Sequence, residues 1–105
     1  MTDDRSRSLA VVRRQLEELD ALERRTLHDL NTVAGAERIA QWKSTTAALL
    51  TETVGRQEGL AFSAIRPGPS FTNDLVEEFT DLVDCYRAPL TALAKRLAET
   101  SRPGG

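Results

Sequence analysis

The chain has 105 residues, of which 40% are hydrophobic and 29% are charged, and its formal net charge at pH 7 is -2. This length and balance favour one folded domain and argue against a disordered chain. Uninterrupted apolar runs are no longer than residues 47–50. A membrane-spanning helix needs roughly 20 apolar residues, so we expect no membrane partner. Basic residues are not clustered, which argues against nucleic acid as a direct partner.

The first residues and the single cysteine bear on the compartment. Residues 1–5 are polar and acidic and lack the apolar segment of a secretory signal. Cys85 is the only cysteine, so one chain can form neither an internal disulfide nor a cysteine-based zinc site. We therefore expect a cytoplasmic protein. His28 is the only histidine, and no sequence neighbour favours a catalytic relay built on it.

The apolar spacing predicts a first helix over residues 3–33, closing before Gly35. Its apolar residues lie three and four apart and then change register, so the two halves of the helix should contact different neighbours. The first stripe is Leu9, Val12, Leu16 and Leu19, and the second is Leu22, Leu27, Leu30 and Val33.

A second helix is predicted over residues 36–54. It should end at Gly55, because glycine readily adopts the left-handed conformation of a helix C-cap. Its apolar side, which includes Ile39, Trp42 and Leu50, predicts the centre of the core. Burial of Trp42 would remove more apolar surface from water than burial of any other residue here.

Residues 55–72 are predicted to be a connector, because Gly59, Pro67, Gly68 and Pro69 break regular structure. The same segment holds Leu60, Phe62, Ile65 and Phe71, which is too apolar for a free linker. We expect it to fold back over one end of the bundle, with a helical turn near residues 60–65.

A third helix is predicted to open at residues 72–74, where Asp74 and Glu77 have the spacing of a capping box, and to continue towards Thr100. Proline removes a backbone hydrogen bond and collides with the preceding turn, so Pro89 predicts a kink or break near Arg87. Residues 102–105 should be a flexible tail. The apolar seam of this helix is the most regular in the chain: Val76, Phe79, Val83, Tyr86, Leu90, Leu93 and Leu97.

These elements predict an all-α domain over residues 1–101. The expected fold is a three-helix antiparallel bundle with two long outer helices and a Gly/Pro-containing connector before the third helix. The outer helices would reach about 45 Å and the middle one about 28 Å. The overhanging seam would then need cover from the connector, a second copy or a larger protein subunit. The predicted interface residues are Val76, Phe79, Val83, Tyr86, Leu90 and Leu93.

Four carboxylates on the third helix, Glu77, Glu78, Asp81 and Asp84, suggest an alternative. Spacings of three and four place several of them on one surface, where they could hold Mg²⁺. All-α nucleotide pyrophosphohydrolases use helical Glu-x-x-Glu and Glu-x-x-Asp pairs in this way, and residues 78–81 resemble the second half of that pattern. The first half has no match, and an acidic first half of a helix also complements the helix dipole. The interpretation that we favour has no catalytic residues and no cofactor.

One further pattern joins Trp42 and Lys43 to Thr46, Leu49, Leu50, Val54 and Gly55 as W-K-x-x-T-x-x-L-L-x-x-x-V-G. It resembles a small helical module of bacterial abortive-infection and TIR-like defence proteins. In that family the module precedes an effector domain and is thought to sense, to bind partners or to oligomerise. The resemblance implies an interaction and assembly module, a partner or regulatory subunit of a defence system.

Overall fold

The computed structural model describes residues 3–68 and 73–100, and these residues form four helices and no strand. The helices are α1 (Asp3–Asp29), α2 (Thr32–Thr53), α3 (Arg56–Ser63) and α4 (Leu75–Thr100). The prediction of an all-α fold is confirmed. The three-helix architecture is corrected to four helices, because the connector contains two full turns of helix. The predicted tail at residues 102–105 lies outside the described residues.

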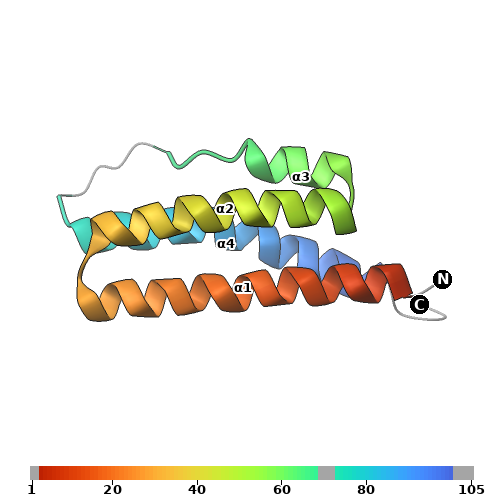
Figure 1. The fold of residues 1–105 in the computed structure, drawn as a ribbon, viewed down its shortest axis with the longest axis horizontal. Helices are drawn as coiled ribbons and strands as arrows, with labels where there is room; N and C mark the ends of the chain where they lie inside the picture. The colour runs from red at the N-terminus through yellow and green to blue at the C-terminus, as the bar shows by residue number, and fades with distance from the viewer. Residues whose placement is uncertain (1–2, 69–72, 101–105) are drawn as a thin grey trace.

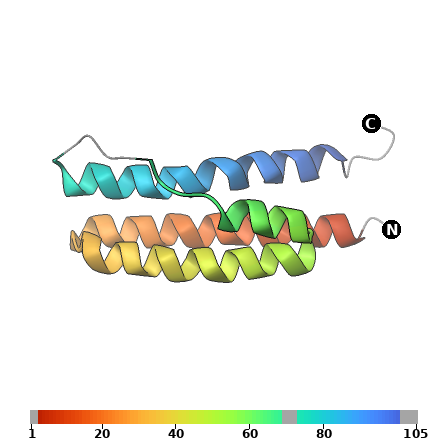
Figure 2. The same ribbon diagram turned by 90° about the horizontal axis from the view of Figure 1, so that it is seen from above.

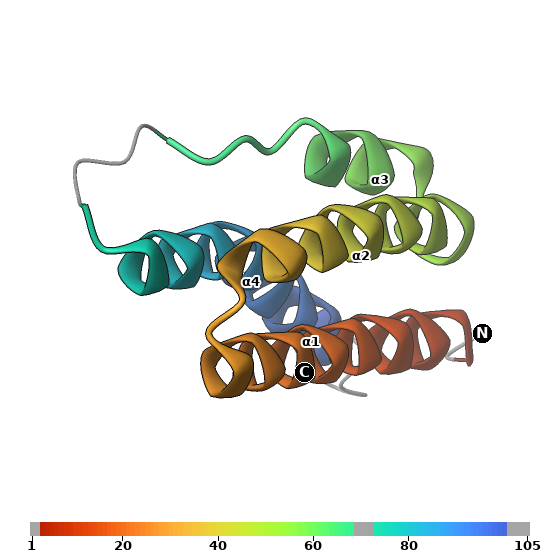
Figure 3. The ribbon, with the colours of Figure 1, turned by 60° about the vertical axis from the view of Figure 1, so that its left-hand side comes forward.

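Three long helices lie side by side, and α3 packs on α2 (Figure 1). Figure 2 shows α2 and α4 running in one direction, with α1 and α3 running in the opposite direction. The molecule is elongated, measuring 49 × 24 × 21 Å. Helix α2 is in contact with the other three helices, and Figure 3 shows it between α1 and α3. At 27, 22 and 26 residues, α1, α2 and α4 differ less in length than predicted.

The first helix ends earlier than the sequence predicted. It stops at Asp29, and Leu30 adopts a left-handed conformation with φ of 57° while its amide donates to the Thr26 carbonyl at 2.7 Å. The Asn31 side chain then accepts a hydrogen bond from the Ala34 amide at 3.1 Å and caps α2. A side-chain cap of this kind starts a new helix because it satisfies an amide that has no partner within the helix. The prediction of a helix reaching residue 33 is therefore wrong.

Gly35 does not end a helix but lies buried within the first turns of α2. A Cβ atom at this position would lie 2.9 Å from Phe79 Cε1 of α4 and would also collide with Thr26 of α1. The missing side chain therefore lets α2 approach both of its long neighbours. This tertiary contact explains the glycine, which the sequence pattern had assigned to a turn.

The turn between α2 and α3 also differs from the prediction. Gly55 has φ of 157° and ψ of 158°, an extended conformation that glycine alone adopts readily, and not the left-handed helical one. It begins α3, which turns back along α2. Gly59 of α3 is buried, and a Cβ there would lie 2.9 Å from Thr51 Cβ and 3.0 Å from the Ala47 carbonyl oxygen of α2. The predicted folding-back of the connector is confirmed.

Helix α4 begins after Asp74, whose Oδ1 accepts from the Val76 amide at 2.9 Å and the Glu77 amide at 3.3 Å. It continues through Pro89 without interruption, so a break near Arg87 is excluded. Proline removes one backbone hydrogen bond, but burial of apolar side chains on both sides of it holds the helix together.

The core joins all four helices around three aromatic rings. Trp42 is 6% exposed, which confirms its predicted place, and its ring centroid lies 5.7 Å from that of Phe62 and 6.1 Å from that of Tyr86. Phe62 comes from α3, so this short helix covers the aromatic end of the core. The other buried apolar residues of this core are Val12, Leu19, Ile39, Leu50, Phe79, Val83, Leu90 and Leu93.

Candidate functional site

The predicted interface seam of α4 is used inside the chain. Phe79, Val83, Tyr86, Leu90 and Leu93 are all buried, none more than 6% exposed. Val76 is half-buried. The regular spacing thus correctly identifies a packed face, but α1, α2 and α3 already cover most of it. In the folded chain these five side chains leave little surface for contact with another protein.

Other surface lies in a hollow between α2, α4 and residues 67–68, which we call the α2–α4 groove. Its volume is about 640 Å³, within the range of ordinary ligand sites. Val33 and Leu75 face it and are 72% and 63% exposed. Ala36, Phe79, Leu82 and Cys85 form its half-buried or buried apolar walls. The exposed Pro67 and Gly68 of the connector also line it.

The polar edge of the groove has one sign of charge. Glu37, Glu78 and Asp81 line it, and no lysine or arginine is among its described lining residues. All three acids are exposed. None of the three carboxylates has an ion-pair or hydrogen-bond partner among residues 3–68 and 73–100. The groove thus combines an apolar floor with unneutralised negative charge.

Lys43 secures the segment next to the groove. Its Nζ donates to the Ile65 carbonyl at 2.7 Å and lies 5.1 Å from the centre of the Tyr86 ring. Burial, with the nearby Arg66, lowers the pKa of Lys43. Burial also raises the pKa of the Cys85 thiol, which outweighs the opposing effect of Lys43. The thiol therefore stays protonated near neutral pH and is not an activated nucleophile.

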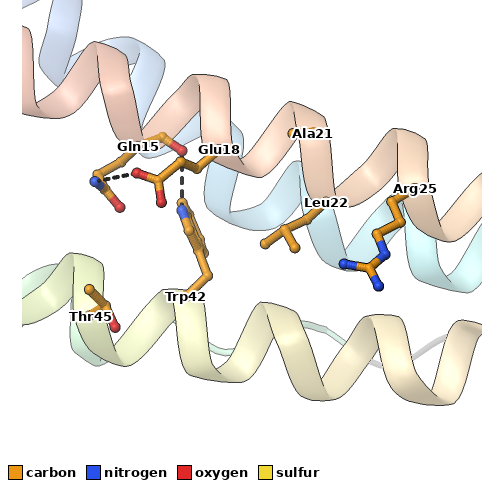
Figure 4. Close-up of a pocket in the computed structure, with 7 residues that line it drawn as sticks. All are labelled: Gln15, Glu18, Ala21, Leu22, Arg25, Trp42 and Thr45. Carbon is orange, nitrogen blue, oxygen red and sulfur yellow. Dashed lines mark hydrogen bonds between the residues drawn. The ribbon is translucent and has the colours of Figure 1, made fainter.

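A second, smaller hollow of about 340 Å³ lies between α1 and α2 (Figure 4). The Trp42 Nε1 donates to the Gln15 carbonyl at 3.1 Å, and the Gln15 side-chain oxygen accepts from Thr46 Oγ1 at 2.8 Å. Gln15 Nε2 in turn donates to Glu18 at 3.1 Å. Each end of the buried Gln15 amide is thus satisfied within the protein, which makes this network structural rather than a ligand site.

The charges on the α1–α4 side are paired with one another. Arg87 contacts Asp20 and Glu23 of α1, each at 2.7 Å, and Asp84 of its own helix at 2.6 Å. Burial by itself would lower the pKa of Arg87, but the hydrogen bonds to Glu23 and Asp20 outweigh it and raise that pKa. The cluster joins α1 to α4, and the Asp84 carboxylate is bound to Arg87 within it.

The four acids of the metal alternative do not meet at one point. Glu77, Glu78 and Asp81 are exposed on α4, and Asp84 is bound to Arg87. Among the described residues, no three or more His, Cys, Asp or Glu side chains gather closely enough to hold a metal ion. Glu78 and Asp81 both lie at the edge of the α2–α4 groove. His28 is exposed near the end of α1.

Sequence reasoning missed the two exposed large apolar residues of the groove, Val33 and Leu75. Val33 had been assigned to a stripe on the first helix, but the turn at residues 30–31 moves it to α2. The available signal was Asn31, a preferred cap residue, two positions before it. Leu75 was not singled out, and Gln15 had no sequence signal at all, because its role depends on Trp42 and Thr46 from another helix.

No family model, curated protein or solved structure matches the chain. In the described part of the chain, every helix is too short or too polar to cross a lipid bilayer.

Proposed function

We propose that the protein is a helical interaction module that binds a partner protein through the α2–α4 groove. The observation that supports this function is the pair of apolar side chains, Val33 and Leu75, that remain more than half exposed on opposite walls of one hollow. Single exposed apolar residues are common, whereas apolar residues that share a concave surface mark binding sites.

A partner would gain from covering these residues, since burial of apolar surface is the main driving force of protein association. Burial raises the pKa of the Cys85 thiol, which does not favour its use as a nucleophile. The exposed apolar pair supports binding directly. The magnesium-dependent hydrolase receives no comparable support from the described residues.

The resemblance of residues 42–55 to the defence-protein module leads us to propose a cellular role of the same kind. The chain would act in the cytoplasm as a partner or regulatory subunit of a larger assembly. Trp42, Thr46 and Leu50 are core residues, so they would hold the module together and would not touch the partner.

Site-specific cross-linking in the cells that naturally make the protein tests this proposal. The photoreactive residue benzoylphenylalanine replaces Val33 in one variant and Leu60 in a matched control. Leu60 is 59% exposed and lies on α3, outside the groove. We expect a discrete covalent adduct from position 33 that position 60 does not give. The absence of an adduct at position 33, or the same adducts from both positions, would refute the proposal.

A further inference from the structure

We propose that the α2–α4 groove receives a basic amphipathic helix of a partner protein, with apolar side chains along one side and Lys or Arg beside them. This inference rests on the proposed function and specifies the partner's chemistry. It draws on three observations: the direction of the groove, its apolar floor and the sign of its edge charges.

The groove continues the position that α3 occupies. Ala36 lines the groove and Ala47 lies under α3, and these residues are eleven apart on α2, so they face the same side of that helix. On α4, Cys85 lines the groove, and Arg96, eleven residues later, pairs with Glu58 of α3 at 3.7 Å. The groove and α3 thus lie along the same sides of α2 and α4, and Figure 2 shows the described residues 64–68 running on from α3 toward the start of α4.

The length of the open part suits a short helix. Helix α3 has 8 residues and spans about 12 Å, whereas α2 has 22 residues and spans about 33 Å. The groove's lining on α4 extends from Leu75 to Cys85, which is about 15 Å or nearly three helical turns. A helix of that length would complete the fourth position of the bundle by placing side chains every three or four residues against Val33 and Leu75.

The charges at the edge select the partner's sign. Glu37 lies on α2, while Glu78 and Asp81 lie on α4, so a helix between them would have carboxylates on both sides. Glu23 and Asp84, which lie outside the groove, are bound by Arg87, whereas no arginine among the described residues pairs with the three edge acids. The unpaired edge acids favour Lys or Arg and repel an acidic helix.

The same charges argue against a second copy as the occupant. The large apolar residues exposed in the described chain are Leu27, Leu30, Val33, Leu60 and Leu75. A symmetric dimer through the groove would bring the same groove of both chains together, and with it Glu37, Glu78 and Asp81 of both chains. Like charges brought together oppose association.

The test uses three fluorescent, helix-stapled peptides of about 10 residues, the number that spans the roughly 15 Å of the groove. All have leucines spaced three and four apart, and the flanking residues are lysine, glutamine or glutamate. Anisotropy titration with the full chain should give a Kd for the lysine peptide at least about tenfold below that of the glutamine peptide, with no binding of the glutamate peptide. Added salt should weaken the lysine peptide's binding.

Charge reversal provides the specific variant. Glu78→Lys combined with Asp81→Lys should remove the preference for lysine and favour the glutamate peptide. The matched control, Glu17→Lys combined with Glu52→Lys, changes the same number of exposed charges outside the groove and should retain the wild-type order. Circular dichroism verifies that both variants fold.

Several results would overturn the inference. These are equal binding of the three peptides, an identical effect of the two double variants, or no binding by any peptide, as expected if a second copy fills the groove. A Val33 cross-link to a partner together with any of these results would leave the proposed function standing and refute only the basic helix. If position 33 gives no cross-link, both the proposed function and the basic-helix partner are refuted.

Discussion

The close packing around Gly35 predicts that Gly35→Ala destabilises the protein, although the same change in an exposed helix stabilises it. Alanine favours a helix interior by about 1 kcal/mol over glycine. The added Cβ would lie 2.9 Å from Phe79 Cε1 and closer still to Thr26. Thr26 is β-branched and fully buried, and Phe79 is 3% exposed, so neither side chain can move away freely.

Overpacking of this kind costs about 1–3 kcal/mol, and two contacts on two different helices place the cost at the upper end of that range. After subtraction of the helix-propensity gain, the free energy of unfolding should fall by about 2 kcal/mol, which corresponds to a fall in Tm of about 10 °C for a domain of this size. Urea unfolding followed by circular dichroism at the helix band measures the change directly.

Two further variants separate steric collision from other causes. Thr26→Ala removes the atoms that a new Cβ would meet on α1, so the double variant with Gly35→Ala should be more stable than the sum of the two single changes predicts. Gly68→Ala, at a position with open space around the glycine, should leave stability nearly unchanged. A stabilised Gly35→Ala variant would refute the reasoning.

Three other predictions concern the core, the ion cluster and the thiol. Trp42→Phe should lower the free energy of unfolding by about 2 kcal/mol, because it leaves a cavity and removes the hydrogen bond to Gln15, and urea unfolding measures this. Arg87→Gln should cost about 1–2 kcal/mol by leaving Glu23, which is 17% exposed, without its partner. The raised pKa of Cys85 predicts that iodoacetamide alkylates the folded protein at pH 8 at least about threefold more slowly than it alkylates glutathione, as followed by mass spectrometry.

The matched control for the ion cluster is Arg14→Gln. The side chains of Arg14 and its partner Glu18 are 80% and 51% exposed. This ion pair should therefore contribute little to the free energy of unfolding, and its loss should be nearly neutral. Equal costs for the two arginine variants would contradict the assignment. A Trp42→Phe variant as stable as wild type, or a Cys85 that reacts as fast as glutathione, would contradict the other two predictions.

The sequence by itself predicted the helices and the buried faces, because a helix that packs on one side repeats its apolar residues every three or four positions. The seam from Phe79 to Leu93 and the buried Trp42 follow from that periodicity. The same pattern placed the end of the first helix too late, since Leu30 and Val33 continue its spacing although Asn31 begins a new helix between them.

Tertiary structure decided which partner covers each face. Periodicity reports that a side of a helix is buried, but it does not distinguish a neighbour in the same chain from another protein, and the seam of α4 proved to be internal. Gly35, Gln15 and the acids beside the groove likewise depend on residues from other helices, and Trp42 and Gln15 are 27 positions apart. These residues lie far apart in the sequence, and only the packing of the helices brings them into contact. Local periodicity cannot predict such contacts, because they depend on which helix faces pack against each other.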